Sequence, residues 1–375
     1  MIPSAVRHVY LHVPFCSRRC SYCDFSIAVR RDVPVDEYLA ALDAELRTRF
    51  GDSAPVEVDT IYLGGGTPSR LGGEGVARAI ELVQRWFPLT SGGELTIEAN
   101  PEDVTSTSAA TWSASGVNRL SLGSQTFSDE ALAWMHRTHD AESIARAVDT
   151  IRGAGIANIS LDLIFALPEA VPRDFEADVA RLLALEPSHV SLYGLTIESS
   201  TPLGKWVASG LTAERREEGY EEEFLRAHDL LTAAGLEHYE VSNYGRPGFR
   251  SRHNSSYWAG VPYVGLGPAA HGFDGITRRW NARAYAAWRD LSLKHTDPIE
   301  GAEQLSDENR IAESVYLGLR SDVGLPLRPG ERDVVEPWRV AGWVTLHADD
   351  RLKCTALGWL RLDALASALT HHRSH

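Results

Sequence analysis

Three of the four cysteines in this 375-residue chain fall within eight consecutive positions. Cys16, Cys20 and Cys23 form a C-x3-C-x2-C pattern, and thiolates this close together repel one another unless a metal neutralises them. Three sulfurs are one short of a closed tetrahedral site. An iron–sulfur cluster bound by three thiolates leaves one iron open, and a small molecule can bind there. The pattern therefore predicts a metal centre and favours an iron–sulfur cluster.

A zinc site is the simpler alternative for these thiols, with His12, Asp24 or a distant residue as the fourth ligand. Zinc ribbons and fingers usually carry a second ligand pair after a short spacer, and no such pair follows here. A disulfide is disfavoured, because no secretory segment precedes the cysteines and an intracellular chain keeps its thiols reduced. The remaining cysteine, Cys354, is expected to be a buried and inert thiol.

The sequence around the cysteines resembles a known family. Residues 9–16 (Val-Tyr-Leu-His-Val-Pro-Phe-Cys) and 20–25 (Cys-Ser-Tyr-Cys-Asp-Phe) are similar to the radical S-adenosylmethionine (SAM) superfamily and, within it, to the oxygen-independent coproporphyrinogen III oxidases. Those oxidases carry a further cysteine two positions after the third, whereas this chain has Phe25. The run instead resembles the HemW-type heme chaperones, a branch of the same family. The resemblance implies a [4Fe-4S] cluster on the three cysteines, with SAM and heme as further cofactors.

A glycine triplet follows the second predicted strand, in the run Gly-Gly-Gly-Thr-Pro at residues 64–68. Consecutive glycines let the backbone approach a ligand closely and offer it N–H and C=O groups. By itself such a triplet is usually a turn. The resemblance to radical SAM proteins implies that Gly65, Gly66 and Thr67 hold the amino group of the methionine part of SAM.

Carboxylates at two other strands are candidate SAM contacts. Glu98 ends a strand, where it can accept both ribose hydroxyls or cap the next helix. Asp162 lies within an apolar strand, where a carboxylate is costly unless it forms a salt bridge or binds a ligand. The resemblance implies SAM contacts for both carboxylates and for Tyr10, Tyr22, Gln125 and Arg137. The two tyrosines are equally compatible with a place in the apolar core.

A second distinctive string is His-Asn-Ser-Ser-Tyr-Trp at residues 253–258. Histidine is a common axial ligand of heme iron, and aromatic rings offer flat apolar area to a porphyrin. A lone histidine in a loop is seldom such a ligand, but this string resembles the heme-binding motif of the HemW-type chaperones, which implies that His253 binds heme. The segment at residues 265–272 (Gly-Leu-Gly-Pro-Ala-Ala-His-Gly) resembles the family's glycine-rich segment along the adenosine pocket.

The composition limits the partners of the chain. The net charge of −14 disfavours binding to nucleic acids and to anionic membrane surfaces, so no nucleic-acid partner is expected. No apolar run is long enough to span a bilayer. We expect a cytoplasmic protein, and a peripheral position at the membrane stays open.

Short apolar runs alternate with segments of helical periodicity, which indicates βα units around a mostly parallel sheet. Six predicted strands, the first at residues 9–13 and the last at 190–193, indicate a partial (β/α)6 barrel, as the resemblance also implies. Most of the candidate SAM contacts lie at or near strand ends, where chemistry gathers in parallel barrels. We expect a core at residues 1–235, a loop-rich segment with the heme motif at 236–296, and a smaller α+β unit similar to a winged helix at 297–375.

Three functions are compatible with these features. The first is a heme chaperone that binds a [4Fe-4S] cluster, SAM and heme and delivers heme to acceptors, among which respiratory membrane proteins are one class. The second is an oxygen-independent coproporphyrinogen III oxidase, and the third is a radical SAM enzyme that acts on another substrate such as RNA. Phe25 and the intact string at residues 253–258 favour the chaperone, and the acidic charge disfavours RNA. No catalytic residue is assigned, and a homodimer stays open.

Overall fold

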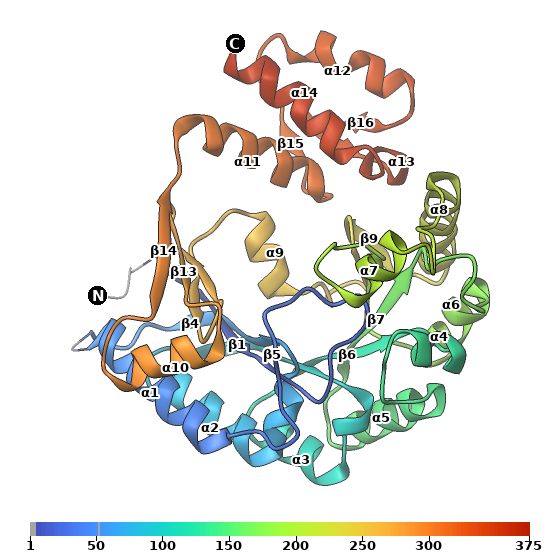
Figure 1. Ribbon diagram of the computed structural model, residues 1–375. Coiled ribbons are helices and arrows are strands. Elements are labelled where there is room, and N and C mark those ends of the chain that lie inside the picture. The colour runs from blue at the N-terminus through green and yellow to red at the C-terminus, as the bar shows by residue number, and fades with distance from the viewer. Residues whose placement is uncertain (1–4, 52) are drawn as a thin grey trace.

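A curved sheet of nine strands forms the centre of the molecule. The computed structural model describes residues 5–51 and 53–375 (Figure 1). The strand order is β11-β1-β4-β5-β6-β7-β8-β10-β9, and the sheet is open. Its strands are β1 (His8–Val13), β4 (Val58–Gly65), β5 (Leu89–Ala99), β6 (Arg119–Gln125), β7 (Asn158–Phe165), β8 (His189–Gly194), β9 (Glu237–Glu240), β10 (Asn243–Gly245) and β11 (Val264–Leu266).

The six central strands, β1 and β4 to β8, run parallel, each paired with the next along the chain. This confirms the predicted partial barrel of six βα units. The helices α1, α2, α3, α5 and α6 cover one side of the sheet (Figure 1). The helices of this part are α1 (Val35–Phe50), η1 (Pro68–Leu71), α2 (Gly72–Gln84), η2 (Pro101–Asp103), α3 (Ser106–Ala114), α4 (Asp129–Trp134), α5 (Ala141–Gly153), α6 (Phe175–Ala184), α7 (Pro202–Ala208) and α8 (Glu217–Ala233).

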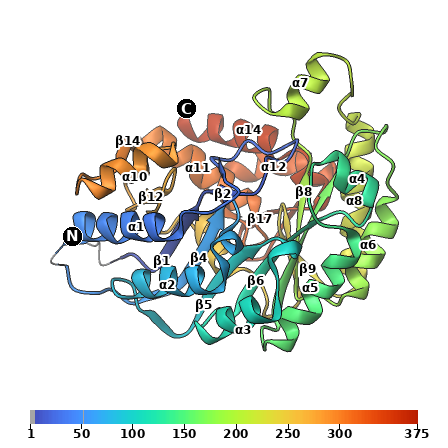
Figure 2. The same ribbon diagram turned by 60° about the horizontal axis from the view of Figure 1, so that its bottom comes forward.

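Helix α7 and the start of α8 differ from the sequence-based expectation. The apolar periodicity of residues 212–234 predicts one long helix there, but α8 begins at Glu217, and the sequence did not predict α7. The side chain of Thr201 caps α7 at its first turn, and Pro202 stands at the first helical position, where its missing N–H costs nothing. These two residues are the local signal for α7, which projects from the molecule near α4 and α8 (Figure 2).

The segment at residues 236–296 contains more regular structure than its composition indicated. Strand β11 extends the sheet by pairing parallel to β1, and β10 and β9 extend the other end with antiparallel pairs. A second sheet, in the order β12-β13-β14, stands beside β1. The remaining elements here and in the cysteine loop are β2 (Phe15–Cys16), β3 (Ala28–Val29), α9 (Arg252–Trp258), β12 (His271–Phe273), β13 (Thr277–Asn281), α10 (Tyr285–Leu293) and β14 (Ile299–Gln304).

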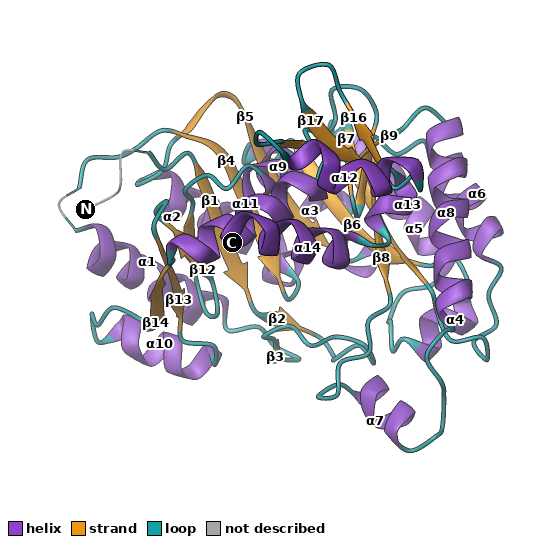
Figure 3. Ribbon diagram, turned by 90° about the horizontal axis from the view of Figure 1, so that it is seen from above, coloured by secondary structure: helices purple, strands orange, loops and turns teal. Residues whose placement is uncertain are grey.

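The C-terminal part is a small α+β unit, as expected. A three-stranded sheet in the order β15-β17-β16 packs with helices that lie across the face of the main sheet opposite α1 to α3 (Figures 1 and 3). The division of the chain into three domains stays a prediction. No helix within the described residues is both long and apolar enough to cross a membrane. The elements are α11 (Asp307–Arg320), β15 (Leu325–Pro326), α12 (Glu331–Val340), β16 (Val344–Leu346), β17 (Arg351–Cys354), α13 (Ala356–Trp359) and α14 (Leu362–Ser374).

A buried carboxylate joins α1 to the second sheet. Glu45 is fully buried, and its oxygens accept hydrogen bonds from Arg49 Nη1 at 2.7 Å and from Asn281 Nδ2 at 2.7 Å. They also accept from the Gly267 backbone N–H at 2.9 Å and from Trp288 Nε1 at 2.9 Å. Because a buried charge is costly unless its partners are in place, this network holds the glycine-rich segment, β13 and α10 in one arrangement against α1.

We predict that Glu45→Ala lowers the free energy of unfolding by about 3–5 kcal/mol, because the buried guanidinium of Arg49 would lose its counterion. Glu81→Ala is the matched control: Glu81 and Arg85 form the same i,i+4 pair at 2.7 Å, but their side chains are 66% and 53% exposed. Removal of that pair should cost at most about 0.5 kcal/mol. Urea unfolding measures both changes, and equal losses in the two variants would contradict the structural role of Glu45.

Candidate functional site

The three clustered cysteines lie on a loop between β1 and α1 and line one cavity of about 450 Å³ near the carboxyl ends of the central strands. The loop is held from several sides. The Ser21 N–H donates to Met135 O at 3.0 Å, and the Leu203 N–H of α7 donates to Ser21 O at 2.8 Å. Strands β2 and β3 pair at the base of the loop. Helices α4 and α7 therefore fix the loop that carries the thiols over the strand ends.

Zinc sites and iron–sulfur clusters hold their thiolates at different separations. Within the described residues, no three His, Cys, Asp or Glu side chains converge closely enough to hold one metal ion. Zinc would draw its thiolates to within about 4 Å of one another, whereas an iron–sulfur cluster spreads them because each binds a different iron. His12 does not complete a zinc site, since its two ring nitrogens face Tyr10 Oη at 3.1 Å and Ser26 O at 2.9 Å.

The metal-free thiols of Cys16 and Cys23 are protonated at neutral pH. Burial raises the pKa of Cys16 to about 11, although the nearby Thr67 hydroxyl opposes that shift. Burial also raises the pKa of Cys23. Binding of a cluster must therefore release protons, and affinity for it is expected to increase with pH.

A half-buried arginine supplies positive charge beside the cysteines. The Arg137 Nη1 atom lies 3.6 Å from Cys20 Sγ, and Nη2 donates to Asn100 Oδ1 at 2.7 Å and to Gly123 O at 2.9 Å. Its Nε atom is buried without a partner among the described residues. A cation held here stabilises an anionic cluster and leaves a donor for a ligand. The predicted position of Arg137 at the site is thus compatible with both roles.

The glycine triplet ends β4 beside the cysteine loop. Gly65 has φ +112°, and a Cβ atom there would lie 2.5 Å from the His12 ring, so only glycine fits without a shift. The Thr67 hydroxyl lies 3.4 Å from Cys16 Sγ. The strand end thus brings Gly65, Gly66 and Thr67 to the wall of the cysteine cavity, where the family resemblance predicts the methionine end of SAM.

Two half-buried carboxylates face the same cavity. Glu98 accepts hydrogen bonds from Tyr62 Oη at 2.7 Å and from the Gly65 N–H at 3.1 Å, and burial raises its pKa. Asp162 accepts from Ser121 Oγ at 3.0 Å. Burial, followed by the nearby charge of Glu98, raises the pKa of Asp162 to about 7. A paired acidic site of this kind suits a ligand that brings positive charge and hydroxyl donors, as SAM does with its sulfonium and ribose.

Most of the residues predicted to contact SAM meet in this cavity. Gln125 adopts φ 68° at the end of β6, an uncommon conformation that places it on the wall. Tyr10 lies instead on a neighbouring cavity of about 590 Å³. Sequence reasoning missed Asn100 and Tyr193, which also line the cysteine cavity, although both lie at ends of predicted strands. The predicted residues on its wall are Cys16, Cys20, Tyr22, Cys23, Gly65, Gly66, Thr67, Glu98, Gln125, Arg137 and Asp162.

His253 lies apart from both of these cavities. It is 1% exposed, and its ring nitrogens bond to Thr60 Oγ1 at 2.7 Å and to Tyr257 Oη at 2.8 Å. Its ring also stacks on Tyr62, with centroids 5.1 Å apart. The predicted heme ligand is therefore a core side chain whose two nitrogens are already engaged.

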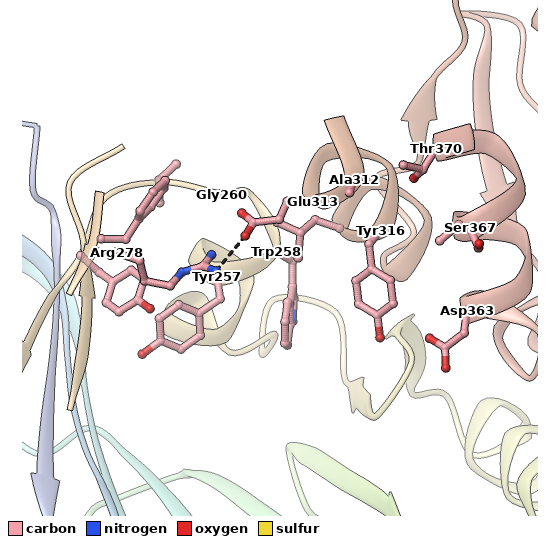
Figure 4. Close-up of a pocket in the computed structure, with 15 residues that line it drawn as sticks. Tyr257, Trp258, Gly260, Arg278, Ala312, Glu313, Tyr316, Asp363, Ser367 and Thr370 are labelled. Atoms are coloured by element: carbon pink, nitrogen blue, oxygen red, sulfur yellow. Dashed lines mark ion pairs between the residues drawn. The ribbon is translucent and has the colours of Figure 1, made fainter. Parts of the chain in front are cut away.

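The last two residues of the same string line a third cavity, of about 680 Å³ (Figure 4). Tyr257 and Trp258 of α9 face it from one side, with Tyr316 of α11 and the polar side chains of α14 opposite. An ion pair between Arg278 Nη1 and Glu313 Oε1, 2.7 Å long, closes one edge. The string thus offers aromatic surface to this cavity, but no histidine.

Comparison with known proteins gives a consistent result. Residues 10–182 match the model of the radical SAM superfamily. The heme chaperone HemW of Mycobacterium tuberculosis is 37% identical over 367 residues, which cover 96% of this chain and 94% of that protein. HemW of Bacillus subtilis is 33% identical, with 85% of each chain covered. Coproporphyrinogen III oxidase (HemN) of Escherichia coli shares the fold, with a TM-score of 0.84, 21% identity and coverage of 99% of this chain and 91% of that one.

We predict that Ala at position 16, 20 or 23 abolishes most of the iron and acid-labile sulfide bound after anaerobic reconstitution, because each thiolate holds one iron. Cys354→Ala is the control. That thiol is buried on β17, away from the cavity, so the variant should keep about four irons and four sulfides per chain. Full loading of a Cys16→Ala, Cys20→Ala or Cys23→Ala protein would exclude the proposed cluster ligands.

We further predict that Asp162 makes the SAM-free protein less stable as pH rises towards 7. Between its ordinary value of 3.8 and its folded value of about 7, the folded state keeps a proton that the unfolded state releases. Stability from this group is thus lost as pH rises through that window and stays constant above it. Thermal unfolding of Asp162→Asn from about pH 5 to about pH 7 should show a flatter dependence than wild type. Asp36→Asn removes an exposed carboxyl and should leave the pH dependence as in wild type. Equal slopes of stability against pH in all three proteins would refute the raised pKa of Asp162.

Proposed function

The chain belongs to the HemW family of heme chaperones within the radical SAM superfamily, and we propose that it binds a [4Fe-4S] cluster, SAM and heme and delivers heme to acceptor proteins. The observation that carries this proposal is the single cavity in which the three cysteines meet the glycine triplet and the two half-buried carboxylates. The sequence similarity to HemW proteins over nearly the whole chain also supports the proposal.

Each part of the cavity has a distinct task. The cysteines hold three irons, and Arg137 balances the negative charge of the cluster beside Cys20. Gly65 and its neighbours receive the methionine end of SAM, and Glu98 and Asp162 accept hydrogen bonds from its hydroxyls. A bound and reduced cluster supplies the electron with which SAM is cleaved. The protein's own part is to orient SAM and to keep water from it.

Phe25 distinguishes the heme chaperone hypothesis from the oxidase hypothesis. It stands where the oxidases carry a further cysteine, and its side chain is 63% exposed between the cysteine cavity and the neighbouring one. An exposed aromatic ring at this place gives a porphyrin a surface for contact and gives the metal no ligand. The likeness to HemN, at 21% identity, extends to the fold alone.

The role of His253 as a heme ligand stays a prediction. Coordination of iron through Nε2 would require the hydrogen bond with Tyr257 to break. The ring would also have to leave its place in the core against Tyr62. The acceptor proteins, their place at a membrane and a homodimer also stay predictions. The acidic net charge of −14 makes a neutral or basic acceptor surface the better partner.

We predict that the reconstituted protein binds hemin, with a new Soret band, and does not decarboxylate coproporphyrinogen III when SAM and a reductant are supplied. The physical reason is that Phe25 replaces the additional thiol of the oxidases. Anaerobic incubation followed by chromatography of the oxidised porphyrins measures the second part. Accumulation of protoporphyrin would favour the oxidase function, and failure to bind hemin would contradict the heme chaperone function.

A further inference from the structure

The cavity of about 680 Å³ lies between the core and the C-terminal unit (Figure 4). Helix α9 and the hairpin of β12 and β13 form one side of it, and α11 and α14 form the other. Its volume is within the range of about 300–1,000 Å³ that is typical of small-molecule sites. It shares no lining residue with the cysteine cavity, so it is a separate candidate for a ligand.

Aromatic side chains make up much of the wall of this cavity. The rings come from α9, from the strands that follow it and from α11: Tyr257, Trp258, Tyr263, Phe273 and Tyr316. Aromatic rings bury large apolar areas and pack favourably against other π-systems, offset or edge to face. A flat, conjugated and largely apolar ligand therefore suits this wall, and a porphyrin is such a ligand.

The ring of Trp258 is fixed before any ligand arrives. The guanidinium of Arg320 lies over it, 4.1 Å from the ring centroid, and Arg320 Nη2 pairs with the buried Glu240 Oε2 at 3.1 Å. A wall that is already ordered loses little conformational entropy when a ligand binds. The indole N–H of Trp258 is buried and has no partner among the described residues, so one donor on this wall awaits an acceptor.

The charged groups give the cavity a direction. Arg278 Nη1 pairs with Glu313 Oε1 at 2.7 Å, and both side chains are about one third exposed, at 35% and 31%. A guanidinium has five N–H donors, so Arg278 can also hold a carboxylate of a ligand. The carboxylate of Asp363 lies across the cavity from Arg278 (Figure 4). The anionic edge of a ligand must therefore point towards Arg278.

Tyr257 connects this cavity to His253. Its Oη atom bonds to His253 Nε2 at 2.8 Å, and the same side chain lines the cavity. The two residues are four apart on α9 and so lie on one face of that helix. Rotation of Tyr257 breaks the hydrogen bond and opens a path from the cavity to Nε2.

The cavity beside Phe25 is the competing position for a porphyrin. Its wall carries the carboxylates of Asp24, Glu98 and Glu300 but a single arginine, Arg283. Propionates would meet like charges there, and a buried like-charge contact is unfavourable. The cavity beside Trp258 has a better balance of charge for the same ligand.

We propose that the porphyrin of heme lies in the cavity between α9 and the C-terminal helices, with a propionate on Arg278 and the iron on the side of Tyr257 and His253. This proposal rests on the heme-binding function above and names its site. The propionate takes the place of Glu313 beside Arg278, and Tyr257 turns away from Nε2. The C-terminal unit is thus one wall of the heme site, and α14 limits the size of the ligand that enters.

Hemin titration of the full-length, cluster-loaded protein, followed by the Soret band, tests the wall made by α14. Ser367 is exposed and lines the cavity, so Ser367→Trp fills space that the porphyrin needs and should weaken hemin binding about tenfold or more. Ala368→Trp is the matched control, because Ala368 is the next residue of the same helix, is exposed and is not part of the wall. It should bind hemin as wild type does. Unchanged circular dichroism and iron loading verify that both variants are folded.

The charge at the rim is tested in the same titration. Arg278→Ala should weaken hemin binding about tenfold, because a charge-assisted hydrogen bond is lost. It should keep the EPR signature of a histidine ligand, because the iron contact is unchanged. Glu313→Gln should strengthen binding, up to about fivefold, because it removes the competing carboxylate. Arg279→Ala is the control: Arg279 is the next residue on β13, faces the other way and pairs with Asp297 at 2.6 Å.

The outcomes separate this site from the broader function. If wild type binds no hemin, the heme chaperone function fails and the site fails with it. If wild type binds hemin, and Ser367→Trp and Arg278→Ala bind it equally well, the function stands and the site is wrong. If Arg283→Ala weakens binding and Arg278→Ala does not, the porphyrin lies in the cavity beside Phe25 and the proposal is overturned.

Discussion

The structure depends on one buried ion pair that ties the first helix to a segment 222 residues further along the chain. Glu45 accepts the Gly267 N–H, and its partner Arg49 donates to Gly265 O at 2.6 Å, so both members of the pair hold the glycine-rich segment. The pair is tolerable in the core because Asn281 and Trp288 supply further donors to the same carboxylate. It follows that the position of β12 and β13 over the barrel mouth is set by electrostatics in the core as well as by apolar packing.

The sequence predicted the central sheet and the cysteine cavity because both follow from local patterns. Strands such as β7 are buried along nearly their whole length, so they read as apolar runs, and their order along the chain is their order in the sheet. Parallel strands place their carboxyl ends at one edge. The family resemblance assigned Glu98, Gln125 and Asp162 to one site, and their places at or near strand ends agree with that assignment although they are far apart in sequence. The C-terminal α+β unit could be predicted in the same way, because its helices and its hairpin show the usual spacing of apolar residues.

The rest could not be predicted because no local signal distinguishes it. Glu45 with Arg49 and Glu81 with Arg85 are the same i,i+4 pattern in sequence, yet one pair is buried and the other exposed. His253 illustrates the converse. Its string offers a histidine beside aromatic residues, but the fold directs the imidazole into the core against Tyr62 and leaves the aromatic residues at the surface of a different cavity. Only tertiary contacts decide which of these polar groups meets solvent.

The cysteine cavity and its neighbour share a wall made by Asp24, Phe25, Gly65 and Glu98. Glu98 is held within this wall, since Tyr62 and Gly65 bond to its two oxygens, and burial raises its pKa. A cation or a hydroxyl donor in one cavity stabilises the charged form of the Glu98 carboxylate. It thereby changes the charge of the wall that a ligand meets in the other cavity. Such coupling is reciprocal: if SAM strengthens binding in the neighbouring cavity, the ligand there strengthens SAM by the same factor. The cavity beside Trp258 shares none of these residues and has no such direct route to the cluster.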